Sequence, residues 1–196
     1  MPPLVLGSAS RYRRELLERL RLPFDVCAPA VDETALAGES PRQLALRLAL
    51  AKARTVAVIR PDAVVIGADQ VADLDGEAIG KPGTHERAAA QLRRLSGRTA
   101  VFQTALTVLR PSTGFERTLL APVKVTFRSL TDDEIERYLL LEQPYDCAGS
   151  AKCETLGIAL LESIESDDPT ALVGLPLIRT AALLREAGID ALNQGT

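Results

Sequence analysis

The segment GSASRYRR, residues 7–14, places serines and three arginines at the expected start of a helix. The apolar run PPLVLG precedes it and leucines at helical spacing follow it, which predicts a strand, a tight turn and a helix. A helix start carries unpaired N–H groups and partial positive charge, so arginines there are unfavourable unless they face an anion. A guanidinium binds phosphate through two parallel hydrogen bonds. One arginine alone would be typical of a solvated surface, but three together favour an anion site using Arg13 or Arg14.

Two carboxylates, Glu33 and Asp69, are expected just beyond the ends of strands. Residues 24–28 predict one strand, and the apolar, β-branched run at residues 63–66 predicts a buried one. In α/β folds, ligands and metal ions bind in the crevice at the carboxyl ends of strands. Either acid taken alone is more typical of a turn cap. Beside a phosphate, however, the pair suits Mg²⁺ or Mn²⁺.

Other polar residues are less informative when each is taken alone. Lys52, on a helix rich in leucine and alanine, and Lys81, in the segment GKP, are typical of solvated lysines. His85 is the one histidine and follows an expected helix cap, so we expect it at the surface, and its isolation argues against Ser-His-Asp or Cys-His catalysis. Asp167 and Asp168 precede a proline and predict a polar turn.

Helices and strands must alternate to position these residues, with both hairpin and crossover connections. The pattern predicts an α/β fold with a mixed sheet curved around a cleft. Ser40, Thr84 and Thr131 are expected helix caps, and the Asp-Gly pair at residues 75–76 predicts a hairpin. The expected elements are helices over 40–58, 84–95, 131–141 and 176–188, and strands over 98–109, 116–128 and 156–164.

The composition narrows the class of protein. The chain has 196 residues, is 46% apolar and carries a net charge of −3, which argues against a general nucleic-acid binder. Three cysteines without a CxxC spacing predict neither a disulfide framework nor a zinc site. No segment reads as a signal peptide or a membrane span. We therefore expect a single domain over residues 1–196 that acts in the cytoplasm, without membrane or nucleic-acid partners.

Eight segments in order resemble the Maf family of nucleoside triphosphate pyrophosphatases: SASRYRRELL, VDET, ESPRQLALRLALAKA, GADQV, LDGEAIGKP, LSGR, CAGSAKCE and VGLPL. The resemblance runs from about residue 4 to residue 188. It implies an elongated mixed sheet flanked by helices, two lobes around a central cleft, and in many members a homodimer. It also implies cleavage between the α- and β-phosphates with a divalent metal (Mg, Mn or Co), by attack of water at the α-phosphate.

The resemblance also assigns roles by position. Asp69 corresponds to the catalytic proton acceptor, and the acids Glu33 and Asp69 correspond to metal ligands. Lys52 and Lys81 correspond to catalytic side chains. Ser8, Ser10, Arg13 and Arg14 correspond to residues that bind the substrate's phosphates.

Residues 12, 70 and 154 fall where the family selects the base. The segments ADQV and CAGSAKCE resemble the branch that hydrolyses 7-methyl-GTP rather than the dTTP/UTP branch. A cationic methylated guanine can stack on Tyr12 and donate hydrogen bonds to Glu154, while Gln70 offers one donor and one acceptor group. Tryptophan is more usual at position 12 in this branch, so the tyrosine is a departure.

Other functions remain open on the sequence alone. The same chemistry could act on dTTP, UTP or other modified nucleotides. The chain could also be a nucleotide-binding regulator of cell division, because the family name is linked to septum inhibition. An RNA-binding role for the arginine-rich helix conflicts with the acidic net charge and the scarcity of aromatic residues.

Overall fold

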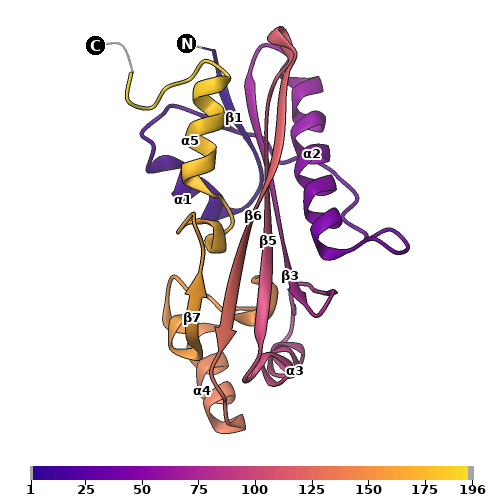
Figure 1. The fold of residues 1–196 in the computed structure, drawn as a ribbon, viewed down its shortest axis with the longest axis vertical. Helices are drawn as coiled ribbons and strands as arrows, with labels where there is room; N and C mark the ends of the chain where they lie inside the picture. Colours follow the sequence, from indigo (N-terminus) through magenta and orange to yellow (C-terminus); the bar gives the residue numbers. More distant parts are fainter. Residues whose placement is uncertain (1, 194–196) are drawn as a thin grey trace.

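Three long antiparallel strands run the length of the computed structural model, which describes residues 2–193 (Figure 1). They are β3 (Val64–Leu74), β5 (Thr99–Arg110) and β6 (Phe115–Phe127). Shorter strands complete a seven-stranded mixed sheet of order β2-β1-β3-β5-β6-β7, with β4 paired to β3. β1 and β2 are parallel to their neighbours, and the other pairs are antiparallel. The short strands are β1 (Leu4–Gly7), β2 (Asp25–Val26), β4 (Glu77–Ile79) and β7 (Leu161–Glu165).

Helices cover both faces of one end of this sheet (Figure 1). Alternate residues of a strand point to opposite faces. Ile66 of β3 packs among leucines of α1 (Arg11–Glu18) and α5 (Leu177–Glu186), whereas Val65 packs against α2 (Pro41–Ile59). At the other end of the sheet, α3 (His85–Leu95) and α4 (Asp132–Glu142) enclose a separate apolar cluster. These elements confirm the predicted α/β class with a mixed sheet.

The predicted local signals are confirmed at several element ends. Ser40 and Thr131 form complete capping boxes, and Thr84 caps α3. At the Asp75–Gly76 turn both residues have positive φ, 54° and 86°, as the tight hairpin requires. Each of these signals depends on residues three or fewer positions apart, which is why the sequence was sufficient.

Three predicted strands have different bounds in the structure. β3 does not end at Ile66 but continues to Leu74, because β5 pairs with it beyond the end of β1. β2 contains two residues instead of 24–28, since only these pair with β1. The predicted strand over 156–164 was wrong in its first half: 3₁₀ turns span Leu156–Leu160, and the β6 ladder reaches only Leu161.

The predicted polar turn at residues 167–168 is partly buried. Asp168 is fully buried and acts as a remote cap of α5, because its Oδ2 accepts the Arg179 N–H at 3.1 Å. Its Oδ1 accepts the Thr170 hydroxyl at 3.1 Å. Pro176, which occupies the N-cap position of α5, makes no side-chain cap.

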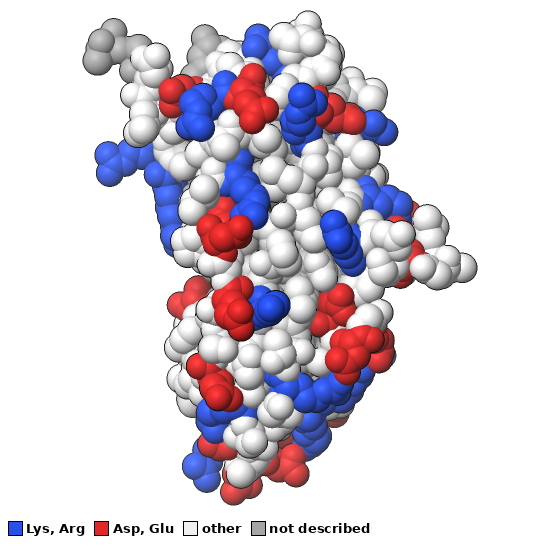
Figure 2. Space-filling view, in the orientation of Figure 1, with Lys and Arg blue, Asp and Glu red and all other residues white. Residues whose placement is uncertain are grey.

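Figure 2 shows lysine and arginine side chains interspersed with acidic ones over the face that it presents, without a continuous basic surface there. Across residues 2–193, none of the helices has the length and apolarity that crossing a bilayer requires.

Candidate active site

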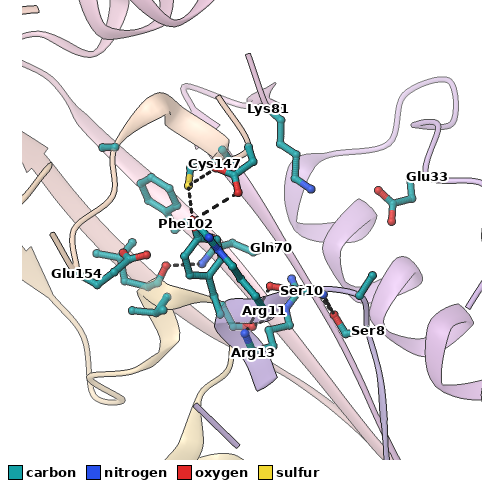
Figure 3. A pocket seen from close by; sticks show the side chains of 18 of the residues that line it. Ser8, Ser10, Arg11, Arg13, Glu33, Gln70, Lys81, Phe102, Cys147 and Glu154 are labelled. Atoms are coloured by element: carbon teal, nitrogen blue, oxygen red, sulfur yellow. Dashed lines mark hydrogen bonds between the residues drawn. The ribbon is translucent and has the colours of Figure 1, made fainter. Parts of the chain in front are cut away.

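A cavity of about 450 Å³ opens beside the N-terminus of α1. Its walls come from the turn after β1, from β3, and from the segments around residues 146–154 and 172–174 (Figure 3). It brings together nearly all of the residues that the family resemblance singled out. Nine of them line it: Ser8, Ser10, Tyr12, Arg13, Glu33, Lys52, Gln70, Lys81 and Glu154.

The turn after β1 holds Arg13 in place. Ser10 caps α1 by accepting the Arg13 N–H, and the buried Ser8 hydroxyl accepts from Arg13 Nη1 at 3.3 Å. Arg13 Nε donates to the carbonyl of Gly174 at 2.9 Å. Burial lowers the pKa of Arg13, while Asp69 and Glu33 oppose that effect. A guanidinium fixed in this way faces the cavity without having to lose side-chain freedom when an anion binds.

Lys52 links the two predicted carboxylates. Its Nζ lies 2.6 Å from Glu33 Oε1 and 2.7 Å from Asp69 Oδ1. Burial raises the pKa of Asp69 despite Lys52 and Arg13 nearby. Burial also opposes ionisation of Glu33, but Lys52, Lys81 and Arg13 together hold the pKa of Glu33 below its usual value. The pKa values of the two carboxylates are therefore shifted in opposite directions.

The close packing of α2 on β3 brings Lys52 to Asp69. A Cβ at Gly67 would lie 2.7 Å from the backbone nitrogen of Ala53 and closer still to the Ala49 carbonyl, so only glycine fits there. Asp69 lies within β3, two residues beyond the last pairing with β1 at Gly67, instead of following the strand as predicted. As a whole residue it is 7% exposed, and it is not among the residues that line the cavity, although it contacts Lys52, which does line it.

Glu33 and Asp69 could supply two carboxylates to a divalent metal, which is fewer ligands than such an ion needs. No cluster of three or more His, Cys, Asp or Glu side chains suited to a metal occurs within residues 2–193. Mg²⁺ is commonly bound by one or two carboxylates together with phosphate oxygens of the substrate. Two carboxylates within reach of one ammonium group therefore fit such an ion if a polyphosphate supplies further oxygens.

Two other predicted residues lie outside the cavity. Arg14 is exposed and pairs with Glu18 at 3.0 Å, so the structure does not support its predicted place beside the phosphate. His85 is half-buried rather than freely exposed, since its ring nitrogens contact Tyr145 and Glu136. It takes no part in the cavity.

The other end of the cavity holds the predicted Tyr12 together with residues that sequence reasoning missed: Phe102, Asp146 and Cys147. The Tyr12 hydroxyl accepts from Arg11 at 2.7 Å and lies 3.4 Å from Asp146 Oδ2, and the Arg11 guanidinium lies 4.7 Å from the Tyr12 ring centroid. Burial is the larger cause, and the neighbouring Asp146 carboxylate the next, of a rise in the pKa of Cys147 to about 12. The thiol therefore stays protonated near neutral pH. Phe102 adds an aromatic wall. The motif CAGSAKCE marked this segment, but Asp146 immediately precedes it.

Charge is divided between the two ends of the cavity. Lys52 contacts Glu33 at one end, where Lys81 and Arg13 also lower the pKa of Glu33. Figure 3 shows Glu154 on the opposite side from Lys81 and Glu33. Within residues 2–193, neither Asp146 nor Glu154 forms an ion pair with a basic side chain at 4.0 Å or less. Basic side chains thus gather around Glu33 at one end, whereas the other end combines Asp146 and Glu154 with one guanidinium, that of Arg11 against Tyr12.

Comparisons with known proteins give matches over nearly the whole chain. The family model described as "Maf-like protein" matches residues 3–187. A protein of Polaromonas sp. strain JS666 is 70% identical over 187 residues, covering 95% of this chain and 85% of its own. Relatives from Albidiferax ferrireducens (64% identical; 97% and 96% covered) and Xanthomonas campestris pv. campestris (60%; 97% and 98%) are similar over nearly their whole length. All three are named 7-methyl-GTP pyrophosphatase.

Proposed function

Because this chain belongs to the Maf family, we propose that it hydrolyses 7-methyl-GTP to 7-methyl-GMP and pyrophosphate. The observation that carries the proposal is the division of charge in one cavity. Arg13, Lys52 and Lys81 lie at one end. At the other end Tyr12 lies near Asp146 and carries the Arg11 guanidinium against its ring, and Glu154 also lines the cavity. A nucleotide with a positively charged base has the complementary arrangement of charge.

The cationic end would bind the triphosphate. A triphosphate carries close to four negative charges, and one divalent ion offsets two of them. Arg13 and Lys81 would complement the remaining charge and stabilise the negative charge that develops on the departing pyrophosphate. The Ser8 hydroxyl would hold Arg13 in the required orientation.

We propose that Glu33 and Asp69 hold a divalent cation (Mg, Mn or Co) together with the phosphates. When bound, such an ion would polarise the α-phosphate and increase the acidity of water. Asp69 would accept the proton of the attacking water, since its pKa is raised by burial and a more basic carboxylate is a better proton acceptor near neutral pH. Lys52 would keep both acids in position.

The other end would select the base. The Tyr12 ring already lies against a guanidinium, and a methylated guanine could stack on it as a cation, with an attraction of about 0.5–2 kcal/mol. Glu154 would accept from the guanine edge. The pyrimidines of dTTP and UTP carry no such positive charge, so we expect dTTP and UTP to be poorer substrates than 7-methyl-GTP.

A nucleotide panel tests the proposal. Pyrophosphate release would be measured with 7-methyl-GTP, GTP, dTTP and UTP, with Asp69→Asn as the inactive control. We expect the highest kcat/KM for 7-methyl-GTP and no measurable turnover in Asp69→Asn. A preference for dTTP would overturn the choice of substrate. Nucleotide binding without turnover would favour a regulatory protein of cell division.

We further propose that residues 1–196 form one Maf-like domain with two lobes around the cavity, acting in the cytoplasm on free nucleotides. A homodimer is compatible with Leu140 and Leu141 of α4, which are 67% and 75% exposed. Analytical ultracentrifugation would test the dimer, and a sedimentation coefficient of a monomer would contradict it.

A further inference from the structure

The side chain of Gln91, on α3, joins two segments that supply walls of the cavity. Its Nε2 donates to the carbonyl of Gly80 at 3.0 Å, and its Oε1 accepts from the Ser150 hydroxyl at 2.6 Å. Gly80 directly precedes Lys81, which lines the cavity, and Ser150 lies within the 146–154 segment. Gln91 itself does not line the cavity. One amide outside the cavity therefore links two parts of its wall.

The chemistry of the two partners determines how this amide is oriented. A carbonyl oxygen only accepts hydrogen bonds, so the amide nitrogen of Gln91 has to face Gly80. The amide oxygen then faces Ser150, whose hydroxyl supplies the hydrogen. Ser150 is fully buried, and an unsatisfied hydroxyl there would be unfavourable. Methionine or leucine at position 91 could not replace both bonds.

The backbone around Ser150 adopts a conformation that needs support. Gly149 and Ser150 have φ values of 72° and 56°, both in the left-handed region. A Cβ at Gly149 would lie 3.1 Å from the ring of Phe102, which lines the cavity. A residue with a side chain is unfavourable at positive φ, and it keeps such a conformation only where its surroundings hold it. The bond from Ser150 to Gln91 provides that hold next to Ala151, another lining residue.

A second contact joins the same two segments. The Gly83 N–H donates to the Tyr145 carbonyl at 3.0 Å, and the Tyr145 hydroxyl lies 3.0 Å from His85 Nδ1 at the start of α3. The lining residues Lys81 and Asp146 are close neighbours of this contact along the chain. α3 therefore supports the two segments at two places, and its residue 91 bonds to both segments directly.

We propose that Gln91 is a positioning residue, which holds Lys81 and the 146–154 segment in register across the cavity. This inference rests on the proposed function and deepens it, because Lys81 would bind the triphosphate and the 146–154 segment would face the base. Gln91 would act only through its bonds to Gly80 and Ser150. A small displacement of either segment would lower the rate, since catalysis depends on the placement of the substrate against the reacting groups.

Gln91→Met tests the proposal, because methionine keeps the length of the side chain but cannot donate to Gly80. We expect kcat/KM for 7-methyl-GTP to fall about tenfold. Binding of pyrophosphate with Mg²⁺, followed by calorimetry, should weaken about fivefold, because Lys81 is then less firmly held. Both are measured at a temperature at which melting curves show that the variant is folded. A change of less than about twofold in either quantity would overturn the proposal.

Ser150→Ala removes one of the two bonds and leaves Gln91 bonded to Gly80. We expect kcat/KM for 7-methyl-GTP to fall about fivefold, because alanine at positive φ is then unsupported. The affinity for pyrophosphate should stay within about twofold of the unaltered value, since the support of Lys81 remains. An unchanged kcat/KM in this variant would overturn the proposal, and this variant decides the question if Gln91→Met does not fold.

Ser96→Ala is the matched control for the loss of a hydrogen bond made by α3. The Ser96 hydroxyl, at the end of the same helix, accepts the Leu130 N–H at 2.7 Å, and neither residue lines the cavity. We expect kcat/KM and pyrophosphate affinity to stay within about twofold of the unaltered values, whatever the change in Tm. Losses equal to those of Gln91→Met would indicate general destabilisation and overturn the proposal.

The two hypotheses fail in different ways. Absence of pyrophosphate release from 7-methyl-GTP by the unaltered protein would overturn the proposed function. The comparison of pyrophosphate binding does not require turnover, so it still tests the role of Gln91 in that case. Release from 7-methyl-GTP at the unaltered rate in folded Gln91→Met would overturn only the role of Gln91.

Discussion

Replacing Lys52 with methionine should destabilise the protein through Asp69. The Lys52 and Asp69 side chains are each 9% exposed, whereas Glu33 is 60% exposed. Removing one partner of a buried ion pair costs about 3–5 kcal/mol, because the other charge remains buried. Glu33 can be solvated by water, and Arg13 still faces Asp69, so we expect the lower end of that range.

A loss of about 3 kcal/mol in a chain of this length corresponds to a fall in Tm of roughly 6–12 °C. The assay is thermal and urea denaturation of Lys52→Met, Asp69→Asn and the double variant, without nucleotide and with a chelator present. The double variant should recover most of the loss, since the buried charge is then absent. A double variant as unstable as Lys52→Met alone would show that Lys52 acts through packing, and would refute the argument.

The same reasoning predicts a pH dependence with a definite sign. The pKa of Asp69 is already raised above its ordinary value of 3.8, and loss of Lys52 should raise it further. In the range between the unfolded and folded pKa values, the native state binds more protons than the unfolded state, so stability increases as the pH falls. The deficit of Lys52→Met should therefore be smaller near about pH 5 than near about pH 8. A deficit independent of pH would contradict a buried carboxylate as its cause.

Three further predictions concern activity. Glu33→Gln and Lys81→Ala should each abolish most pyrophosphate release while changing Tm by no more than about 2 °C. Both side chains are exposed and act through their charge. A large fall in Tm would show instead that these residues support the fold. Arg14→Ala should leave kcat/KM within about twofold of the unaltered value, since Arg14 pairs with Glu18 outside the cavity. A loss of about tenfold or more would show that Arg14 does bind phosphate. Glu154→Ala should retain turnover but lower the preference for 7-methyl-GTP over GTP by about tenfold or more, and an unchanged ratio of kcat/KM for the two nucleotides would remove Glu154 from base selection.

One placement that the structure corrects could have been derived from the sequence. Successive residues of a helix are about 100° apart around its axis. Arg13 lies three and four residues before Leu16 and Leu17, the buried residues of α1, and so shares their face. Arg14 is rotated away from the centre of that face. The leucine spacing therefore distinguishes the two arginines.

The sequence by itself determined the features that depend on near neighbours along the chain. The strand-turn-helix around Ser8, the capping boxes and the Asp75–Gly76 hairpin follow from residues a few positions apart, and the ordered motifs indicated the family. The mixed sheet followed from the alternation of such elements.

Only the tertiary structure decided how the site is assembled. Lys52 and Asp69 are 17 residues apart, and Gln70 is 101 residues from Ala171, so these contacts depend on the packing of α2 and of the 171–174 loop against β3 and not on local preference. Burial raises the pKa of Asp69. The Gln70 amide nitrogen donates to the Leu172 carbonyl. The residue type determines which chemical groups a side chain carries. Its charge state and its free hydrogen-bonding atoms depend on the groups that the fold places beside it.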